Sequence, residues 1–239
     1  MAGRTRQVIA LGGGGFLMEP DNPVLDLYVL RQARTANPAV TFLCTARGDA
    51  DFNVVKFYKA FTSYGCHAAH LPLFERTPKL REYLLRQDVI YVGGGNTKSM
   101  LAVWREWGLP ALLQEAWQEG IVLAGVSAGA ICWYQQGVTD SWAEKLTVLE
   151  CLGFLEGSCC PHYDGEPGRR PAYHDFLLKK EISPGFAIDD YAAVHLIEGE
   201  VHRVVASKPE ARAYRVRVHA GMVQEEPLEA EYLRNTSAG

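Results

Sequence analysis

The sequence predicts an α/β protein: a doubly wound, mostly parallel sheet flanked by helices, with a C-terminal antiparallel extension. Three observations support this fold class. Through the first two-thirds of the 239 residues, short β-rich runs alternate with amphipathic helical patterns, and each crossover helix must pack back onto the sheet. Glycine-bearing loops follow three of the β-rich runs. After about residue 185 the helical patterns stop, and short alternating runs follow, as in antiparallel strands.

The alternation begins with a β-rich run at residues 7–11 and a helical pattern at 22–35, where Asn22 can cap the helix and Pro23 suits its first turn. A strand at 40–44 and a helix at 52–64, started by Asp51, repeat the pattern. The remaining expected elements are a strand at 68–71, a helix at 80–86, a strand at 89–92, helices at 99–107 and 110–119, and a strand at 121–125.

The C-terminal part is expected to form antiparallel strands. Runs at 192–197 and 202–206 flank Glu198–Val201, whose composition suits a hairpin turn, and a third run alternates at 213–218. No low-complexity or Pro/Ser-rich stretch divides the chain. We therefore expect residues 1–239 to form a single domain.

Composition excludes several classes of partner. The chain is 48% hydrophobic and 22% charged, with a net charge of −4 and a pI of about 6.0, which predicts a packed globular protein. Because no stripe of lysine and arginine occurs, neither nucleic acid nor an anionic membrane is the expected partner. No apolar run reaches the 18 residues of a membrane span, and the apolar run at 8–11 that follows the basic segment 1–7 is too short for the core of a signal peptide. A cytoplasmic location is expected.

The six cysteines, at positions 44, 66, 132, 151, 159 and 160, show no C-x-x-C spacing, and several lie inside apolar runs. This pattern favours reduced core thiols over a disulfide framework. No zinc-binding motif such as H-E-x-x-H occurs. We predict neither a metal site nor a cofactor.

Three glycine loops follow expected strands, where the ligands of parallel sheets gather. The loop at 12–15 would need glycine at position 17 to match a dinucleotide-binding pattern, and Leu17 occupies that position. The loop at 93–99 lacks both glycines of a phosphate loop, since Val92 and Thr97 occupy their positions. Neither loop predicts a nucleotide site.

The third loop, Gly125–Gly129, has the form Gly-x-Ser-x-Gly between a β-rich run and a segment that can start a helix. This is the sequence form of a nucleophile elbow. Small residues on both sides of the central serine allow a sharp turn that lifts its hydroxyl above the sheet. The sequence therefore predicts Ser127 as a nucleophile, with a tight turn around a bystander serine as the alternative.

The segments Gly93–Thr97, Gly125–Ala130 and Cys160–Tyr163, in this order and spacing, resemble the peptidase E (aspartyl dipeptidase) and cyanophycinase family of serine peptidases. The resemblance runs over most of the chain. It implies a fold like that of class I glutamine amidotransferases, with serine in place of their cysteine at the elbow. The implied activity is peptide hydrolysis, and a homodimer is expected on the same ground.

The resemblance places His162 beside Ser127 as the base that activates the hydroxyl. The residue after a nucleophile normally donates its N–H to the oxyanion, and that residue is Ala128. The second donor is expected from the turn at Gly94 and Gly95, and Asn96 is expected to contact substrate.

Two aspartates are candidates for the acid that orients the imidazole. By resemblance, Asp190 corresponds to a Pro-Glu-Gly acid of some family members, and Asp140 to an aspartate shortly after the elbow in others. The two choices give different chain orders, Ser-His-Asp for Asp190 and Ser-Asp-His for Asp140, and we prefer Asp190. For either residue the alternative is a turn-capping aspartate.

Cleavage after an N-terminal aspartate would need a cation to bind the acidic side chain, and Arg169 and Arg170 are the nearest candidates after His162. They could equally be solvated loop charges. Lys98 and Asp189-Asp190-Tyr191 depart from the aspartyl dipeptidase pattern, so strict aspartate preference stays open. A cyanophycinase-like activity, an α/β-hydrolase esterase and a non-catalytic binding module on the same fold stay open as well.

Overall fold

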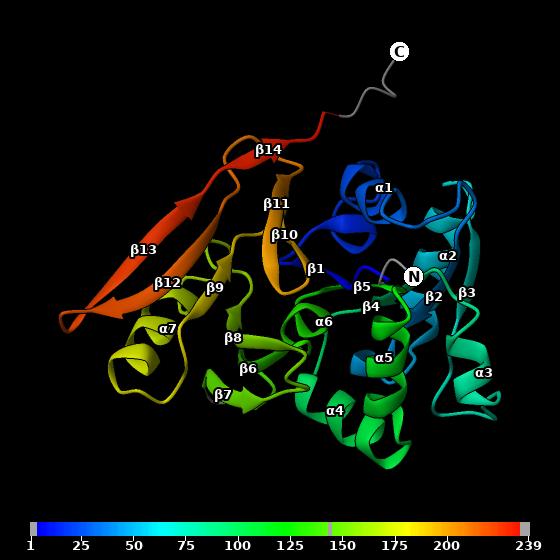
Figure 1. The fold of residues 1–239 in the computed structure, drawn as a ribbon, viewed down its shortest axis with the longest axis horizontal. Coiled ribbons are helices and arrows are strands. Elements are labelled where there is room, and N and C mark those ends of the chain that lie inside the picture. Colours follow the sequence, from blue (N-terminus) through cyan, green and yellow to red (C-terminus); the bar gives the residue numbers. More distant parts are fainter. Residues whose placement is uncertain (1–3, 143–144, 235–239) are drawn as a thin grey trace.

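The computed structural model describes residues 4–142 and 145–234, which form two sheets with helices packed against them (Figure 1). The first three residues of the basic segment 1–7 lie outside this part of the chain. The first sheet has eight strands in the order β14-β11-β10-β1-β5-β4-β2-β3. Their bounds are β1 (Gln7–Leu11), β2 (Ala39–Leu43), β3 (His67–His70), β4 (Val89–Val92), β5 (Val122–Val126), β10 (Ala192–Ile197), β11 (Glu200–Ala206) and β14 (Ala230–Tyr232).

Five strands of this sheet, β1 to β5, run parallel, and β10 joins β1 antiparallel. Helices cover both faces, because successive strand residues point to opposite sides. Val8 and Ala10 pack with one core cluster, whereas Ile9 and Leu11 pack with another. The first face is covered by α3 (Leu80–Leu84), α4 (Thr97–Glu106), α5 (Leu109–Gln118) and α6 (Ala128–Ile131), and the second by α1 (Val24–Leu30) and α2 (Asp51–Phe61). The doubly wound parallel sheet that the sequence predicts is confirmed.

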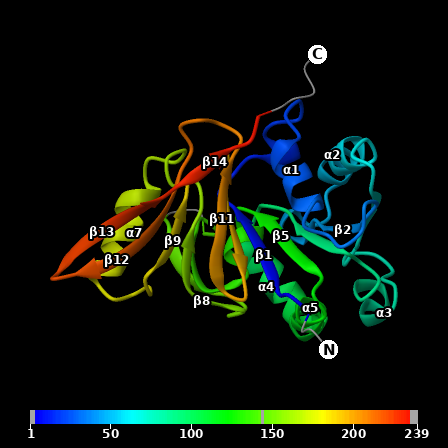
Figure 2. The same cartoon turned by 45° about the horizontal axis from the view of Figure 1, so that its top comes forward.

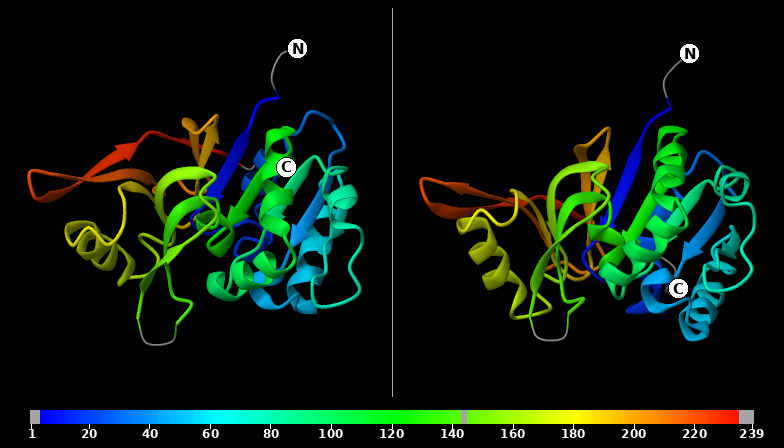
Figure 3. Two further views of the ribbon diagram at one scale, coloured as in Figure 1. Left: turned by 60° about the horizontal axis from the view of Figure 1, so that its bottom comes forward. Right: turned by 90° about the horizontal axis from the view of Figure 1, so that it is seen from below.

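The second sheet has six strands in the order β13-β12-β9-β8-β6-β7. Its strands are β6 (Tyr134–Thr139), β7 (Thr147–Glu150), β8 (Leu155–Cys160), β9 (Gly185–Ile188), β12 (Ala213–His219) and β13 (Met222–Leu228). Helix α7 (Arg169–Leu178) packs against it, and the hairpin of β12 and β13 projects from the end of the molecule (Figures 2 and 3). The antiparallel extension was expected, but β6 to β9 and α7 were not.

The observed bounds of several elements can be compared with those that the sequence predicts. The strands expected at 7–11, 89–92 and 192–197 have these bounds in the structure. The helix expected at 22–35 is shorter: it ends at Leu30, after which Gln32 and Ala33 donate to the carbonyls three residues back, a tightening typical of helix ends. Two short 3₁₀ helices, η1 (Gly15–Leu17) and η2 (Thr45–Arg47), follow β1 and β2.

All six cysteines are unpaired; four are buried, and Cys66 and Cys151 are half-buried. In residues 4–142 and 145–234, no helix is long and apolar enough to cross a membrane. Nor does this part of the chain contain a group of three or more His, Cys, Asp or Glu side chains that could hold a metal ion.

Candidate active site

Ser127 lies in a strained turn between β5 and α6. Its backbone has φ 58° and ψ −112°, a conformation that costs a non-glycine residue about 1–3 kcal/mol. Main-chain hydrogen bonds hold it there. The Ser127 N–H donates to the carbonyl of Leu11 at 3.1 Å, and the Ser127 carbonyl accepts from Ala130 and Ile131 at 2.9 and 3.1 Å. Strain at a turn that the surrounding main chain enforces is typical of a nucleophile elbow.

The two glycines of the elbow are required by close backbone contacts. A Cβ on Gly125 would lie 2.3 Å from the carbonyl oxygen of Gly129. A Cβ on Gly129 would in turn lie 2.2 Å from the carbonyl oxygen of Val92, at the end of β4. Neither contact could accommodate a side chain, so the motif packs the turn directly against the neighbouring strand.

His162 and Asp190 meet at the ends of two neighbouring strands of the second sheet. His162 follows β8 and Asp190 follows β9, and these strands pair in parallel. The Nδ1 atom of His162 lies 2.6 Å from Oδ1 of Asp190, and the two side chains are only 16% and 13% exposed. An ionised carboxylate only accepts hydrogen bonds, so in this contact the ring nitrogen Nδ1 is the one placed to donate to an ionised Asp190.

The carboxylate of Asp190 is wedged between two glycines. A Cβ on Gly13 would lie 1.9 Å from Oδ1 of Asp190, and one on Gly165 would lie 1.9 Å from Oδ2. The Asp190 N–H donates to Asp164 at 2.8 Å. Gly13 belongs to the loop after β1 of the first sheet, so each sheet contributes to the position of the acid.

A pocket of about 360 Å³ brings four of the predicted site residues together. Ser127, His162, Gly94 and Gly95 all line it, and its remaining lining residues are Gly14, Leu17, Met18, Arg47, Phe52, Asn53, Lys56 and Val126. Gly94 packs on the serine, since a Cβ there would lie 3.2 Å from Cβ of Ser127. As the first residue of α6, Ala128 has an N–H with no acceptor inside the helix.

Two predicted site residues have other partners. Asn96 caps α4: its Oδ1 accepts from the Ser99 N–H at 2.9 Å, and its Nδ2 donates to the Ser141 carbonyl at 3.0 Å. The Asp140 side chain is 63% exposed and lies 3.6 Å from Arg169. Of the two carboxylates that the sequence offers for the triad, Asp190 is therefore the one that contacts His162.

Arg169 and Arg170 are both engaged within the second sheet and α7. Arg169 is buried, pairs with Glu166 at 2.6 Å and donates to the Val138 carbonyl at 3.0 Å. Arg170 lies 3.4 Å from Glu225 and above the ring of Tyr163. Neither arginine is among the residues that line the pocket of Ser127.

The sequence analysis missed two cations that do line this pocket. Arg47 ends η2, directly after β2, and Lys56 lies on α2 with its Nζ 4.5 Å from the ring centre of Phe52. Neither Arg47 nor Lys56 takes part in an ion pair with another described residue. In the sequence, only the position of Arg47 after an expected parallel strand could have indicated a role in the site. Lys56 has the sequence context of any solvent-facing helix residue.

Two buried carboxyl groups lie close to the site. Burial raises the pKa of Asp189 to about 6, and the nearby Asp164 acts in the same direction. Burial also raises the pKa of Asp26 to about 7. Asp26 lies beneath the loop after β1, where a Cβ on Gly15 would be 2.9 Å from its Oδ1, and Tyr91 donates to that oxygen at 3.1 Å.

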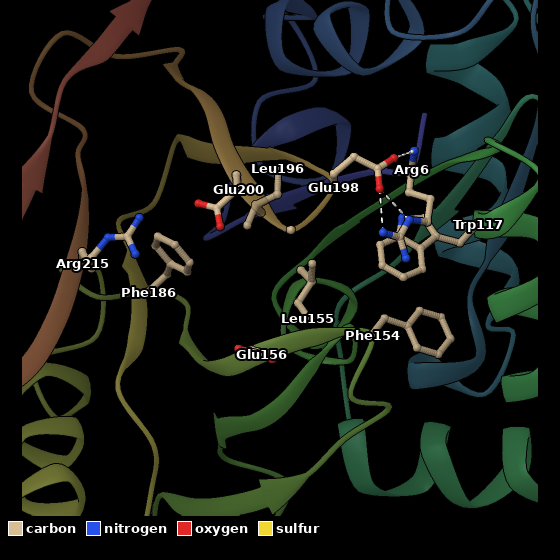
Figure 4. Close-up of a pocket in the computed structure, with 11 residues that line it drawn as sticks. Arg6, Trp117, Phe154, Leu155, Glu156, Phe186, Leu196, Glu198, Glu200 and Arg215 are labelled. Carbon is tan, nitrogen blue, oxygen red and sulfur yellow. Dashed lines mark hydrogen bonds and ion pairs between the residues drawn. The ribbon is translucent and has the colours of Figure 1, made fainter. Parts of the chain in front are cut away.

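A second hollow, of about 420 Å³, lies where β1 and β8 begin (Figure 4). The Ser127 pocket lies elsewhere, where β5 ends. Arg6 lies over the Trp117 ring and forms an ion pair with Glu198 at 2.6 Å. The lining residues of this hollow include no serine, cysteine or histidine. It therefore lacks the nucleophile and base that the first pocket holds.

Comparison with known proteins shows the family to which the chain belongs. The model of peptidase family S51 matches residues 8–204. The chain is 50% identical to "Uncharacterized peptidase YgaJ" of Bacillus subtilis (strain 168) over 229 residues, covering 95% of this chain and 99% of that protein. It is 29% identical to "Peptidase E" of Pasteurella multocida (strain Pm70) over 139 residues, covering 54% of this chain and 59% of that protein.

A solved structure shares the fold. The crystal structure of a peptidase from an acI-B1 actinobacterium superposes with a TM-score of 0.72 at 19% identity, covering 95% of this chain and 96% of that one. The family model covers most of the chain, and the residues that form the pocket lie within it. The protein is a serine-type peptidase and belongs to peptidase family S51.

Proposed function

We propose that the protein hydrolyses short peptides through an acyl-enzyme on Ser127, with His162 as general base and Asp190 as the acid that orients it. The observation that carries the proposal is the 2.6 Å contact between His162 and Asp190 beside a pocket that also contains the strained Ser127. A serine hydroxyl becomes a useful nucleophile only when an imidazole removes its proton, and the carboxylate fixes the ring in the correct tautomer.

The proposed reaction has two acyl-transfer steps. Nε2 of His162 takes the proton of Ser127 Oγ as the oxygen attacks the peptide carbonyl carbon. The N–H groups of Ala128 and of the turn at Gly94 and Gly95 donate to the oxyanion. The imidazolium then protonates the departing amine, and a water activated by the same ring hydrolyses the ester and regenerates the serine.

We further propose that the pocket prefers an acidic residue on the acyl side, as in Asp-X peptides. Support comes from Arg47 and Lys56, two cations on the wall of a pocket whose lining residues include no carboxylate. A carboxylate bound between them in a small pocket gains charge-assisted hydrogen bonds. A substrate role for Arg169, Arg170 and Asn96 stays a prediction, and their existing partners favour Arg47 and Lys56 instead.

Activity assays on purified protein test the proposal. The wild-type protein and Ser127→Ala would be compared on Asp-X, Asn-X, Ala-X and longer peptides. We expect hydrolysis of dipeptides by the wild-type protein, and a loss of at least about 10⁴-fold in kcat for Ser127→Ala with the thermal unfolding curve unchanged. Unchanged activity in Ser127→Ala would remove the serine mechanism.

The proposed preference for acidic substrates is tested by substituting the two cations of the pocket. Arg47→Gln and Lys56→Gln should each raise KM for Asp-X by about tenfold, and change KM for Asn-X by less than about threefold, because only the charged substrate loses a partner. Lys79→Gln is the matched control, since Lys79 is 83% exposed and pairs with Glu82 on α3. Equal losses on Asp-X and Asn-X would argue against recognition of the acidic side chain.

A homodimer and a cytoplasmic location stay predictions. Sedimentation of the purified protein over a range of concentrations tests the first.

A further inference from the structure

Tyr163, the residue that follows His162, is anchored in the core of the second sheet. Its side chain is 2% exposed. Its ring lies edge-on to Tyr173, with centroids 6.3 Å apart, and 5.7 Å from Tyr214 of β12. The Tyr163 N–H donates to the carbonyl of Ile188, at the end of β9, at 3.1 Å. Both its main chain and its ring are therefore fixed.

The buried hydroxyl of Tyr163 ends in a charged cluster. It donates to Oε1 of Glu225, on β13, and Nε2 of His174 lies 2.7 Å from the same oxygen. Arg170 lies 3.4 Å from Oε2 of Glu225, with its guanidinium carbon 4.5 Å above the Tyr163 ring. Glu225 is 21% exposed, so this carboxylate depends on these partners in place of water.

The charged cluster can influence the position of His162 because Tyr163 is the next residue along the main chain. His162 has φ 52°, in the left-handed region that few residues other than glycine adopt, although histidine adopts it more often than most. Contacts of the neighbouring residues hold this backbone conformation. One enforcing contact is the Glu166 N–H, which donates to the His162 carbonyl at 3.1 Å. The next residue along the chain, Tyr163, supplies the other. A shift of the Tyr163 ring would turn the backbone at His162 and move its imidazole relative to Asp190.

We propose that Glu225, with Arg170 and His174, clamps Tyr163 and thereby positions the imidazole of His162 for catalysis. Glu225 is thus a positioning residue, supplied by the C-terminal hairpin, whose residues do not line the pocket of Ser127. The inference rests on the proposed function, in which His162 is the general base. It gives the projecting hairpin of β12 and β13 a role in the reaction.

Kinetics of Glu225→Gln test the clamp. This variant keeps the shape of the side chain and removes its charge, so the Tyr163 ring is held less firmly. Misplacement of a catalytic group by about 1 Å costs on the order of 10²-fold; we therefore expect kcat on a dipeptide to fall by about 10- to 100-fold, with KM within about twofold of wild type. The matched control is Glu226→Gln, on the same strand, where Glu226 is 56% exposed and lies 3.8 Å from Arg217. It should stay within about twofold in both constants.

A second variant and a second readout keep the test decisive. Tyr163→Phe removes only the hydroxyl and should lower kcat in the same direction, which decides the matter if Glu225→Gln does not fold. NMR titration of the His162 imidazole should show a changed midpoint and altered shifts in both variants, but not in Glu226→Gln. Wild-type kcat and an unchanged imidazole signal in Tyr163→Phe or a folded Glu225→Gln would overturn the proposal. If the wild-type protein cleaves no peptide, the proposed function fails, and the imidazole signal still decides whether the clamp exists.

Discussion

The two sheets hold their parts of the site by different means. In the first sheet, main-chain contacts fix Ser127: Gly125 packs on Gly129, Gly129 on the end of β4, and the serine N–H bonds to Leu11. In the second sheet, side-chain contacts fix the base and acid, and His162 depends on Asp190 for its orientation. Apart from the glycines, main-chain hydrogen bonds do not depend on the identity of the side chains around them, whereas a side-chain contact is lost when a single atom changes. The position of the Ser127 backbone should therefore tolerate substitution of neighbouring non-glycine residues better than the contact between the base and the acid does.

Asp190→Asn should have the largest effect in this comparison. The amide keeps the shape of the carboxylate, but can donate to Nδ1 of His162 and so stabilise the wrong tautomer of the ring. In a serine triad such a change lowers kcat by on the order of 10⁴-fold. We expect a loss of this size, measured on a dipeptide substrate, with the unfolding midpoint close to that of the wild-type protein.

Asp140→Asn is the matched control, since Asp140 was the other aspartate that the sequence offered. Its side chain is 63% exposed and lies 3.6 Å from the buried Arg169, which keeps Glu166 as a nearer partner at 2.6 Å. We expect kcat within about threefold of wild type. If Asp140→Asn lost as much activity as Asp190→Asn, the contact between His162 and Asp190 would not be the one that catalysis uses.

Gly13→Ala tests the contact between the two sheets. The new Cβ would lie 1.9 Å from Oδ1 of Asp190 and 3.1 Å from Nδ1 of His162, so the acid must move. Displacement by about 1 Å predicts a loss of about 10²-fold in kcat. Gly168→Ala serves as the control. Gly168 has φ −77°, which alanine adopts readily, and the Cβ of the new alanine would lie 3.8 Å from Cδ1 of Leu146, an ordinary contact. A Gly13→Ala enzyme as active as Gly168→Ala would mean that the acid is not confined from the first sheet.

The first sheet was the easier half to predict. Its strands at 7–11 and 89–92 are short apolar runs buried on both faces, and local composition is enough to identify them. The Gly-x-Ser-x-Gly spacing likewise follows from contacts between near neighbours. In β8, by contrast, Glu156, Gly157 and Ser158 have low β-propensity, and Gly157 has φ 78°. Only pairing with β6 and β9 makes this segment a strand.

The site residues likewise include some that local sequence cannot identify. Asp140 and Asp190 are indistinguishable by local sequence, and it is the pairing of β8 with β9 that brings Asp190 to His162. Arg47 and Lys56 were missed because a surface cation reveals its role only when the orientation of its helix is known. His162 came from the resemblance to a family, since six other histidines compete with it in the sequence.

The first sheet also contains a buried side chain, Asp26, next to the loop after β1. Changes at Asp26 should affect the stability of this sheet more than they affect activity. It is fully buried, and its Oδ2 has no hydrogen-bond partner among the described residues. Burial raises its pKa to about 7, against an ordinary value of about 3.9. Between these values the unfolded chain releases the proton while the folded protein keeps it. The contribution of Asp26 to the free energy of unfolding must therefore fall as pH rises from about 4 to about 7 and then level off.

Asp26→Asn has no proton to release in this window, so the difference between the two proteins isolates the group. Relative to the variant, the wild-type protein should lose free energy of unfolding as pH rises from 4 to 8, by up to about 4 kcal/mol, since each pKa unit corresponds to about 1.4 kcal/mol. Urea unfolding at pH 4, 6 and 8 measures it. Activity at pH 8 should change by less than about threefold, because Tyr91 can still donate to the amide oxygen. Parallel pH curves for the two proteins would show that Asp26 is ionised in the folded state, and the loop after β1 would then contain a buried charge.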